Sequence, residues 1–383
     1  MKVKHTIKRI EVIPLKVPLK RKFSGSHYFM THRCTIITRI ITDTGIVGEI
    51  YNGDEMDAQE AVMDMIVNRM GPLMIGQDIF SIQTIWKKNH EFTFDILSDR
   101  KIALQAVACI DCSLYDAIGK ALSIPLHQVW GYSRTKLPVM IIGGYYTDGV
   151  EWDKEQITNE MKHFKEMGAI GCKFKVGGRS PEIDALRVEA ARRAGGDDFV
   201  LAVDANQAWT RMEALNFTNR VKHLNLRWFE EPCNWYNDRA AMRDIRFMSG
   251  IPVNAGQSEV SAAGCIELMN AGAIDLCNYD ASWGGGATSW LQVAAAGAAL
   301  GIEMAHHEEP QVAAQLLASA PTGTYMEVFH PDRDPLFYEI VLNRNPFLQG
   351  YYEVPTGPGW GIELNPDVVA KYRVDGNKVL FIE

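Results

Sequence analysis

The chain has 383 residues, of which 47% are hydrophobic and 22% charged, and a formal net charge of −8. These values are those of a globular protein with ample material for a large core, and the length favours two domains. The acidic balance, without a dense block of lysine or arginine, argues against a nucleic-acid-binding protein, whose phosphate contacts need a basic face. The sequence has no run of 18 apolar residues, so we expect no membrane span. The start lacks the apolar core of a signal peptide, so we expect a cytoplasmic protein.

Residues 1–135 are expected to form an α+β domain. Amphipathic alternation predicts strands at 7–18 and 34–50. Helical patterns follow near 57–70, 81–93 and 98–121. The polar, aromatic segment 21–33 between the first strands is predicted to be a mobile loop. The tail 350–383 returns to loop and strand, and we expect it to complete this first domain.

Cysteine usage indicates a reduced protein. Seven cysteines are scattered along the chain, and Cys172 and Cys277 stand among apolar neighbours, which predicts buried thiols. Cys109 and Cys112 have the spacing of redox and zinc sites, but they stand in a helical pattern with no second Cys/His pair nearby. We therefore interpret this pair as packing residues of a helix.

Residues 136–349 have a different character. Eight short apolar runs, from "VMIIGGYY" at 139–146 to "TYMEVF" at 324–329, alternate with helical stretches. Strand–helix alternation predicts a parallel sheet with right-handed crossovers, and eight copies predict a closed (β/α)8-type barrel. The predicted fold class is therefore α/β, a barrel with an α+β capping domain.

Polar residues end seven consecutive runs, from the second to the eighth. They are Lys173, Lys175, Asp204, Asn206, Glu230, Gln257, Asp280, His307 and Glu327. Catalytic groups of such barrels lie at the C-terminal ends of the strands. One acid at a strand end is often only a helix N-cap, but a whole ring of polar residues would be costly to bury without a function. We interpret the ring as the active site.

The residue types in this ring predict a particular chemistry. Asp204, Glu230 and an oxygen from the fifth strand end suit Mg²⁺, which prefers hard oxygen ligands. Lys173 and Lys175 share one face of a strand, and the charge of the first is expected to lower the pKa of the second towards that of a base. On adjacent strand ends, Asp280 is expected to fix the tautomer of His307.

This pattern resembles the enolase superfamily, mandelate racemase group, over nearly the whole chain. The motifs that carry the resemblance are Lys173-Phe174-Lys175, Asp204-Ala205-Asn206, Glu230-Glu231-Pro232, Asp280 before a glycine-rich turn, His307 and Glu327. The resemblance implies a (β/α)7β-like barrel beneath a capping domain, a bound Mg²⁺, and a homo-oligomer. It also implies removal of the proton α to a carboxylate through an ene-diolate, with Lys175 and a His307–Asp280 dyad as the two bases.

The third metal ligand departs from the family pattern. An acid usually ends the fifth strand, where this chain has Gln257, whose amide oxygen can ligate Mg²⁺ but brings no charge. Glu259, two residues further on, is a candidate substitute. A non-catalytic sugar-acid binder with a degenerate metal site is the corresponding alternative.

The substrate is expected to be a small carboxylic acid with many hydroxyl groups. The polar side chains expected to line its pocket are His27, Tyr28, His32, Tyr51, Asn52, Tyr145, Tyr146 and Trp283. The resemblance implies that a site with a lysine and a His–Asp dyad acts on acid sugars, that is, on aldonates or aldarates. Dehydration to a 2-keto-3-deoxy acid is the favoured reaction, and racemisation, epimerisation or lactone cycloisomerisation are alternatives. A Schiff-base lysine enzyme is a further alternative, but it leaves Asp204 and Glu230 unexplained.

Overall fold

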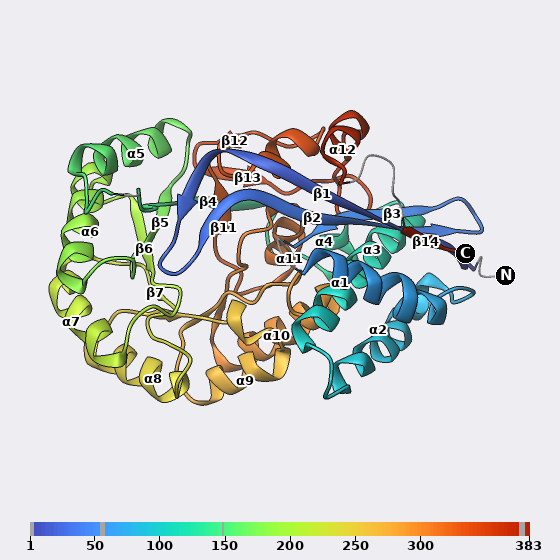
Figure 1. Ribbon diagram of the computed structural model, residues 1–383, viewed down its shortest axis with the longest axis horizontal. Helices are drawn as coiled ribbons and strands as arrows, with labels where there is room; N and C mark the ends of the chain where they lie inside the picture. The colour runs from blue at the N-terminus through green and yellow to red at the C-terminus, as the bar shows by residue number, and fades with distance from the viewer. Residues whose placement is uncertain (1–3, 54–57, 148, 375–379) are drawn as a thin grey trace.

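A barrel of eight parallel strands forms the larger part of the computed structural model, which describes residues 4–53, 58–147, 149–374 and 380–383 (Figure 1). Its strands are β4 (Lys136–Gly143), β5 (Gly171–Lys175), β6 (Val200–Asp204), β7 (Phe229–Glu230), β8 (Val253–Asn254), β9 (Leu276–Cys277), β10 (Glu303–Met304) and β11 (Met326–Phe329). β4 to β10 pair in chain order and β11 pairs with β4. The circle is closed by the Met304 N–H, which donates to the Thr322 carbonyl, and by the Thr324 N–H, which donates to the Met304 carbonyl.

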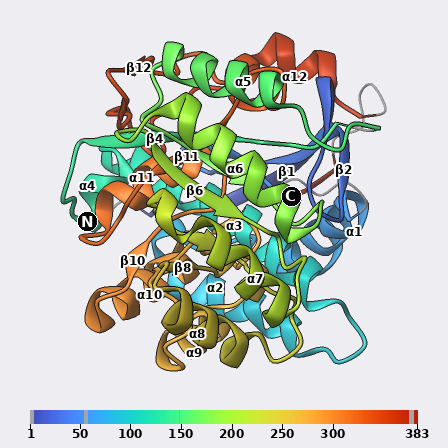
Figure 2. The same ribbon diagram turned by 90° about the vertical axis from the view of Figure 1, so that its left-hand side faces the viewer.

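Seven helices connect these strands and cover the outside of the barrel (Figure 2). They are α5 (Lys154–Glu166), α6 (Pro181–Gly195), α7 (Arg211–Val221), α8 (Asp238–Ser249), α9 (Ala262–Asn270), α10 (Gly286–Leu300) and α11 (Pro310–Ser319). Local sequence sets their starts: the Thr210 side chain accepts from the backbone N–H of Glu213 in a capping box before α7. A helix after each of the first seven strands gives the (β/α)7β arrangement, so the predicted fold class is confirmed.

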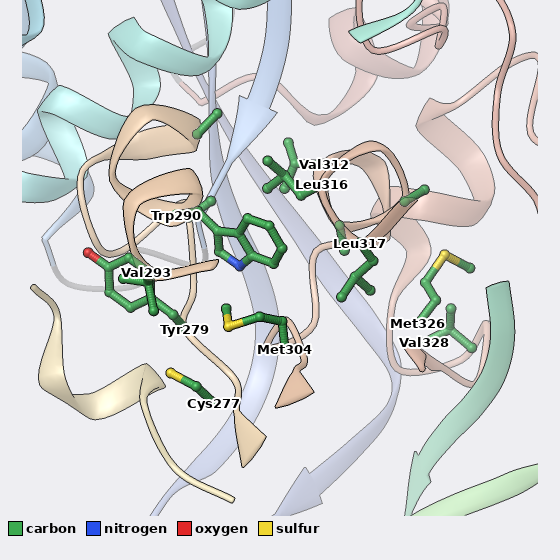
Figure 3. Close-up of a cluster of buried hydrophobic side chains, with 14 of the residues drawn as sticks. Cys277, Tyr279, Trp290, Val293, Met304, Val312, Leu316, Leu317, Met326 and Val328 are labelled. Atoms are coloured by element: carbon green, nitrogen blue, oxygen red, sulfur yellow. The ribbon is translucent and has the colours of Figure 1, made fainter. Parts of the chain in front are cut away.

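Apolar side chains join the helices to the outer face of the barrel. Figure 3 shows Trp290 and Val293 of α10 and Leu316 of α11 above Met304 and its neighbours on the strands. Trp290, Met304 and Leu316 are all fully buried. Burying such side chains stabilises the fold by about 1.5–3 kcal/mol each, and this packing fixes the strand ends on which the polar ring stands.

A four-stranded antiparallel sheet and four helices make up the capping domain. The sheet runs in the order β14-β1-β2-β3, with β1 (Ile7–Ser24), β2 (Phe29–Thr42), β3 (Val47–Asn52) and β14 (Leu380–Ile382). The helices are α1 (Gln59–Asp64), α2 (Ile82–His90), α3 (Arg100–Leu122) and α4 (Leu126–Trp130), with the π-helical turn η1 (Met65–Met70) after α1.

The prediction of a mobile loop at 21–33 is wrong. These residues extend β1 and β2 into a long hairpin that reaches across the barrel, with its turn at 25–28 (Figure 1). Docking explains the order: the Phe23 ring lies 4.3 Å from that of Tyr145, and the Tyr146 N–H donates to the Ser24 carbonyl at 3.1 Å. Tertiary contacts therefore override a composition typical of a loop.

Helix α3 forms the core of the capping domain. It is long and apolar enough to cross a membrane, but 94% of its most apolar 18-residue stretch is buried inside the protein. Cys109 and Cys112 lie within it, and all seven cysteines are buried thiols. The helix packs between β3 and α10, so it also ties the cap to the barrel.

The C-terminal segment serves both domains. It contains β12 (Phe347–Leu348), β13 (Tyr351–Glu353), α12 (Pro366–Tyr372) and β14. β13 pairs with β4 of the barrel, whereas β14 pairs with β1 of the cap. The tail therefore passes to the capping domain later than the predicted boundary at residue 350.

Candidate active site

Strand register brings four polar residues into one row at the mouth of the barrel. Lys175 is the neighbour of Asp204, Asp204 of Glu230, and Glu230 of Asn254 across three parallel strand pairs. Adjacent strands lie about 4.8 Å apart, so neighbouring side chains in the row are within bonding reach. All four are buried.

The two lysines are held by carboxylates rather than facing each other. Lys173 Nζ donates to Glu230 Oε1 and to Glu327 Oε2, both at 2.8 Å. Lys175 Nζ donates to Asp204 Oδ2 at 2.6 Å, and Asp204 Oδ2 also lies 3.6 Å from Lys173 Nζ. Three buried carboxylates thus meet two ammonium groups, which we call the acid–lysine cluster.

The predicted lowering of the Lys175 pKa is not what this arrangement gives. Burial lowers the pKa of Lys175, but Asp204 and other nearby negative groups outweigh burial, and the pKa is raised well above its usual value. The sequence argument considered only the charge of Lys173 and not the nearby acids. Burial raises the pKa of Asp204, but the charges of Lys175 and Lys173 outweigh burial and lower this pKa to about 2. Burial, followed by repulsion from Asp204 and Glu327, raises the pKa of Glu230.

Two further donors fix the other oxygen of Glu230. Glu230 Oε2 accepts from Trp228 Nε1 at 3.0 Å and from Asn254 Nδ2 at 2.9 Å. Neither residue was predicted to belong to the site. Asn254 ends β8, but it lies inside the fifth apolar run, three residues before Gln257, which was taken as the end of that run. On Asp204, the second oxygen accepts from the Asn206 backbone N–H at 2.8 Å.

The donor set at this mouth fits a hard divalent cation. Asp204 and Glu230 are fully buried carboxylates whose charge is balanced only by ammonium groups. Asn254 Oδ1 is a buried oxygen without a hydrogen-bond partner in the described part of the chain. Carboxylate and amide oxygens are ligands of Mg²⁺. The described residues contain no group of three or more His, Cys, Asp or Glu side chains that could hold a metal ion.

Gln257 and Glu259 have different surroundings. Gln257 is buried, with its Oε1 accepting from Asn278 Nδ2 at 3.0 Å and its Nε2 donating to Glu231 Oε2 at 3.4 Å. The carboxylate of Glu259 instead pairs with Arg239 at 2.8 Å. Glu259 is therefore engaged elsewhere, and Gln257 with its neighbour Glu231 faces the acids.

The dyad on the opposite side has the predicted contact. His307 Nδ1 lies 2.9 Å from Asp280 Oδ2. Asp280 Oδ1 accepts from the backbone N–H groups of Ser282 and Trp283 at 2.7 and 3.2 Å. The Trp283 ring lies 4.9 Å from the imidazole. With Nδ1 on the acid, Nε2 is the nitrogen left for a reacting group.

An ion pair that sequence reasoning missed reaches this nitrogen. Glu308 Oε1 lies 3.3 Å from His307 Nε2, and Arg33 of β2 lies 3.2 Å from Glu308 Oε2. Burial lowers the pKa of His307, but Glu308 and Asp280 outweigh it and raise the pKa to about 10. The imidazole is therefore charged at neutral pH. Arg33 stands in the segment 21–33 that was predicted to be a mobile loop.

Glu308 lies near both predicted bases. The pKa of Glu308 is lowered well below its usual range although burial raises it, and the groups that lower it are Arg33, His307 and Lys175. One carboxylate thus interacts with both the lysine of β5 and the histidine that follows β10.

The capping domain brings some of the predicted substrate contacts to this space. Lys175 Nζ lies 5.8 Å from the ring centroids of both Tyr28 and Tyr145. Tyr51 lines a small pocket beside Glu308. Asn52 Nδ2 donates to Ser282 Oγ at 2.8 Å, next to the dyad.

Three predicted contacts lie elsewhere. His27 is exposed in the hairpin turn. His32 is half-buried, with Nδ1 2.7 Å from Thr31 Oγ1. Tyr146 donates its hydroxyl to the Asp184 carboxylate at 2.9 Å, because successive residues point to opposite sides of an extended segment. Only Tyr145 of the two adjacent tyrosines therefore faces Lys175.

Backbone strain is concentrated at this mouth. Ten non-glycine residues in the described ranges have positive φ, and five of them directly follow β6, β7 and β10. The five are Asn206, Gln207, Glu231, Glu308 and Glu309. Such conformations cost of order 1–3 kcal/mol each and persist where the surrounding structure fixes them, commonly at functional sites.

Family models match both parts of the chain. The model described as mandelate racemase/muconate lactonizing enzyme, N-terminal domain, matches residues 9–131. The model described as enolase C-terminal domain-like matches residues 156–368. Together they cover the cap and the barrel.

Solved structures and characterised proteins resemble the whole chain. A crystal structure described as a mandelate racemase/muconate lactonizing enzyme is 48% identical, covers 97% of this chain and 100% of its own, and has a TM-score of 0.93. Another, from a marine actinobacterium and in complex with magnesium, is 46% identical with coverage of 97% and 100% and a TM-score of 0.90. Arabinonate dehydratase of Saccharolobus solfataricus is 28% identical over 88% of this chain and 90% of its own length. Other relatives are named as cycloisomerases, epimerases and racemases.

Proposed function

The chain belongs to the mandelate racemase/muconate lactonizing enzyme family of the enolase superfamily, and we propose that it dehydrates an acid sugar to a 2-keto-3-deoxy acid. The observation that supports this proposal is that Glu308 interacts with both Lys175 and His307, with Asp204 bonded to Lys175 at 2.6 Å. An amine and an imidazole that face one carbon skeleton can remove a proton at one carbon and protonate a leaving group at the next.

Asp204, Glu230 and Gln257 would hold Mg²⁺, which supplies positive charge to stabilise the negative charge that develops on the substrate carboxylate. Lys173 would bind the same carboxylate from the side of β5, and Glu327 on β11 would hold Lys173 in position. Lys173 is fixed by two carboxylates at 2.8 Å, so its charge is held in place before substrate arrives. Preorganised charge of this kind is a large contributor to catalysis.

Lys175, in its neutral form, is proposed to take the proton from the carbon next to the carboxylate. Mg²⁺ held by Asp204 would favour that form by offsetting the negative charge that raises the pKa of the lysine. The electron pair of the C–H bond moves into the carboxylate and gives an ene-diolate. His307, charged because Glu308 and Asp280 raise its pKa to about 10 against burial, then donates its Nε2 proton to the β-hydroxyl. That hydroxyl leaves as water, and the resulting enol tautomerises to the 2-keto acid.

The proposal is tested with the purified protein, Mg²⁺ and a library of aldonates and aldarates. Formation of a 2-keto acid, measured by semicarbazone absorbance, is the expected result. In parallel, exchange of the α-proton in D₂O is followed by NMR. Exchange without a 2-keto product would instead establish a racemase, epimerase or cycloisomerase, which the same pair of bases can serve. Binding without exchange would support a non-catalytic sugar-acid binder.

A further inference from the structure

A small pocket adjoins the Arg33–Glu308 ion pair. Its polar lining residues are Arg33, Tyr51, Glu308, Glu309, Gln311 and Asp334. We call it the distal pocket, because Glu308 stands between it and His307 Nε2, on the dyad side of the mouth. A substrate that reacts between Lys175 and His307 would extend its far end towards this pocket.

The distal pocket is rich in negative charge. Its lining holds three carboxylates and one guanidinium. That guanidinium is already engaged, since Arg33 lies 3.2 Å from Glu308 Oε2 and also donates to the Arg333 carbonyl at 3.2 Å. Burial, followed by repulsion from Asp280, raises the pKa of Glu309 to about 8, so Glu309 is largely neutral at pH 7 and the negative charge of the pocket comes from Glu308 and Asp334. A second substrate carboxylate would therefore meet like charge, which costs several kcal/mol.

The same pocket offers unused hydrogen-bonding capacity. Tyr51 is only 2% exposed, and its hydroxyl has no hydrogen-bond partner among the described residues. A buried hydroxyl is costly to leave unpaired. Carboxylate oxygens accept hydrogen bonds from hydroxyl groups, so Glu308 and Tyr51 together suit a polyol rather than an anion.

We propose that the distal pocket receives the hydroxylated end of a substrate with a single carboxylate, an aldonate, and discriminates against a dicarboxylate, an aldarate. This inference rests on the proposed function for the orientation of the substrate, whose carboxylate lies at the acid–lysine cluster.

The test compares matched acids with the same carbon number and configuration. Galactonate with galactarate, gluconate with glucarate, and arabinonate with arabinarate differ only in a terminal hydroxymethyl or carboxylate group. We expect calorimetry of the intact protein with saturating Mg²⁺ to show at least about 100-fold tighter binding of the aldonate in the best-bound pair. Equal or tighter binding of the aldarate, or no binding of any aldonate, would overturn the inference.

Two variants locate the discrimination. Glu308→Gln removes one negative charge with little change in size, and we expect the aldonate-to-aldarate preference to fall at least about tenfold. Tyr51→Phe should weaken aldonate binding about threefold to tenfold. Tyr115→Phe, the same change at another buried tyrosine outside the distal pocket, serves as the matched control and should bind like the parent. An unchanged preference in Glu308→Gln would contradict the assignment.

Binding and turnover separate this inference from the proposed function. If aldonates bind preferentially but yield no 2-keto acid, dehydration fails and the pocket assignment stands. If an aldarate binds as well as its aldonate and is dehydrated, the pocket assignment fails and the proposed function stands.

Discussion

The two sides of the barrel mouth are built by different means. On the side of β5 to β8, Lys175 bonds to Asp204 and Glu230 to Asn254, in each case a residue in register on the neighbouring strand. On the dyad side, Glu308 lies in a loop with a φ of +48° and meets Arg33, 275 residues away in the sequence. Strand register makes the first side a property of the barrel alone. The second depends on the docking of the capping hairpin.

The largest effect should come from the acid–lysine cluster. Asp204→Asn leaves two buried ammonium groups without their shared carboxylate, and breaking such a pair costs about 3–5 kcal/mol. We expect a lower midpoint in chemical denaturation and loss of Mg²⁺ binding and activity. EDTA should abolish activity in the parent protein and Mg²⁺ should restore it. Parent-like stability of Asp204→Asn would show that the cluster is not held in this way.

Loss of either base should also be severe. We expect Lys175→Met and His307→Asn each to lower kcat for dehydration by about 10²–10⁴-fold, the usual contribution of a positioned acid or base. Lys165→Met removes another lysine, which donates to the Gly195 carbonyl outside the mouth, and should leave kcat unchanged. A fall of less than about tenfold in either base variant would remove that residue from the mechanism.

The dyad should control the pH profile. Because a charged His307 with a pKa of about 10 is the proposed acid, dehydration should decline as pH rises through that value and the imidazole loses its proton. Asp280→Asn removes one cause of the raised pKa, so the alkaline limb of kcat should move to lower pH. A limb that stays in place would mean that another group sets it. Arg33→Met removes the ion-pair partner of Glu308 and should move the alkaline limb less than Asp280→Asn does.

The third metal ligand should show the smallest differences. Gln257→Ala is expected to weaken Mg²⁺ binding at least about tenfold, and Gln257→Glu to strengthen it, since ligand charge tunes affinity. Glu259→Gln is the matched control, because that carboxylate pairs with Arg239. Its loss should cost about 0.2–1 kcal/mol of stability and leave calorimetric Mg²⁺ affinity unchanged. The reverse ranking would make Glu259 the ligand.

The strand-end rule accounts for how much of the site the sequence predicted. It placed Lys173, Lys175, Asp204, Glu230 and Glu327 at one rim and His307 beside Asp280, because parallel strands in one barrel end at one rim. It did not reveal that the lysines bond directly to the acids. It could not reveal the Arg33–Glu308 pair, which requires knowledge of how the hairpin docks. It also derived the Lys175 pKa from the charge of Lys173 alone, whereas Asp204 and Glu230 raise that pKa.

The fold was predictable for the same reason. Eight apolar runs at regular spacing specify the barrel, since each strand is buried on both faces. The hairpin was missed because residues 21–33 are polar and gain order from the contact of Phe23 with Tyr145, which no local pattern encodes.

Exchange of the substrate α-proton with solvent in D₂O, followed by NMR for His307→Asn and Lys175→Met, bears most directly on the division of labour between the two bases. If Lys175 removes the proton and His307 releases the hydroxyl, His307→Asn should still exchange the proton while forming no 2-keto acid, and Lys175→Met should do neither. Exchange in Lys175→Met at the parent rate would contradict this account.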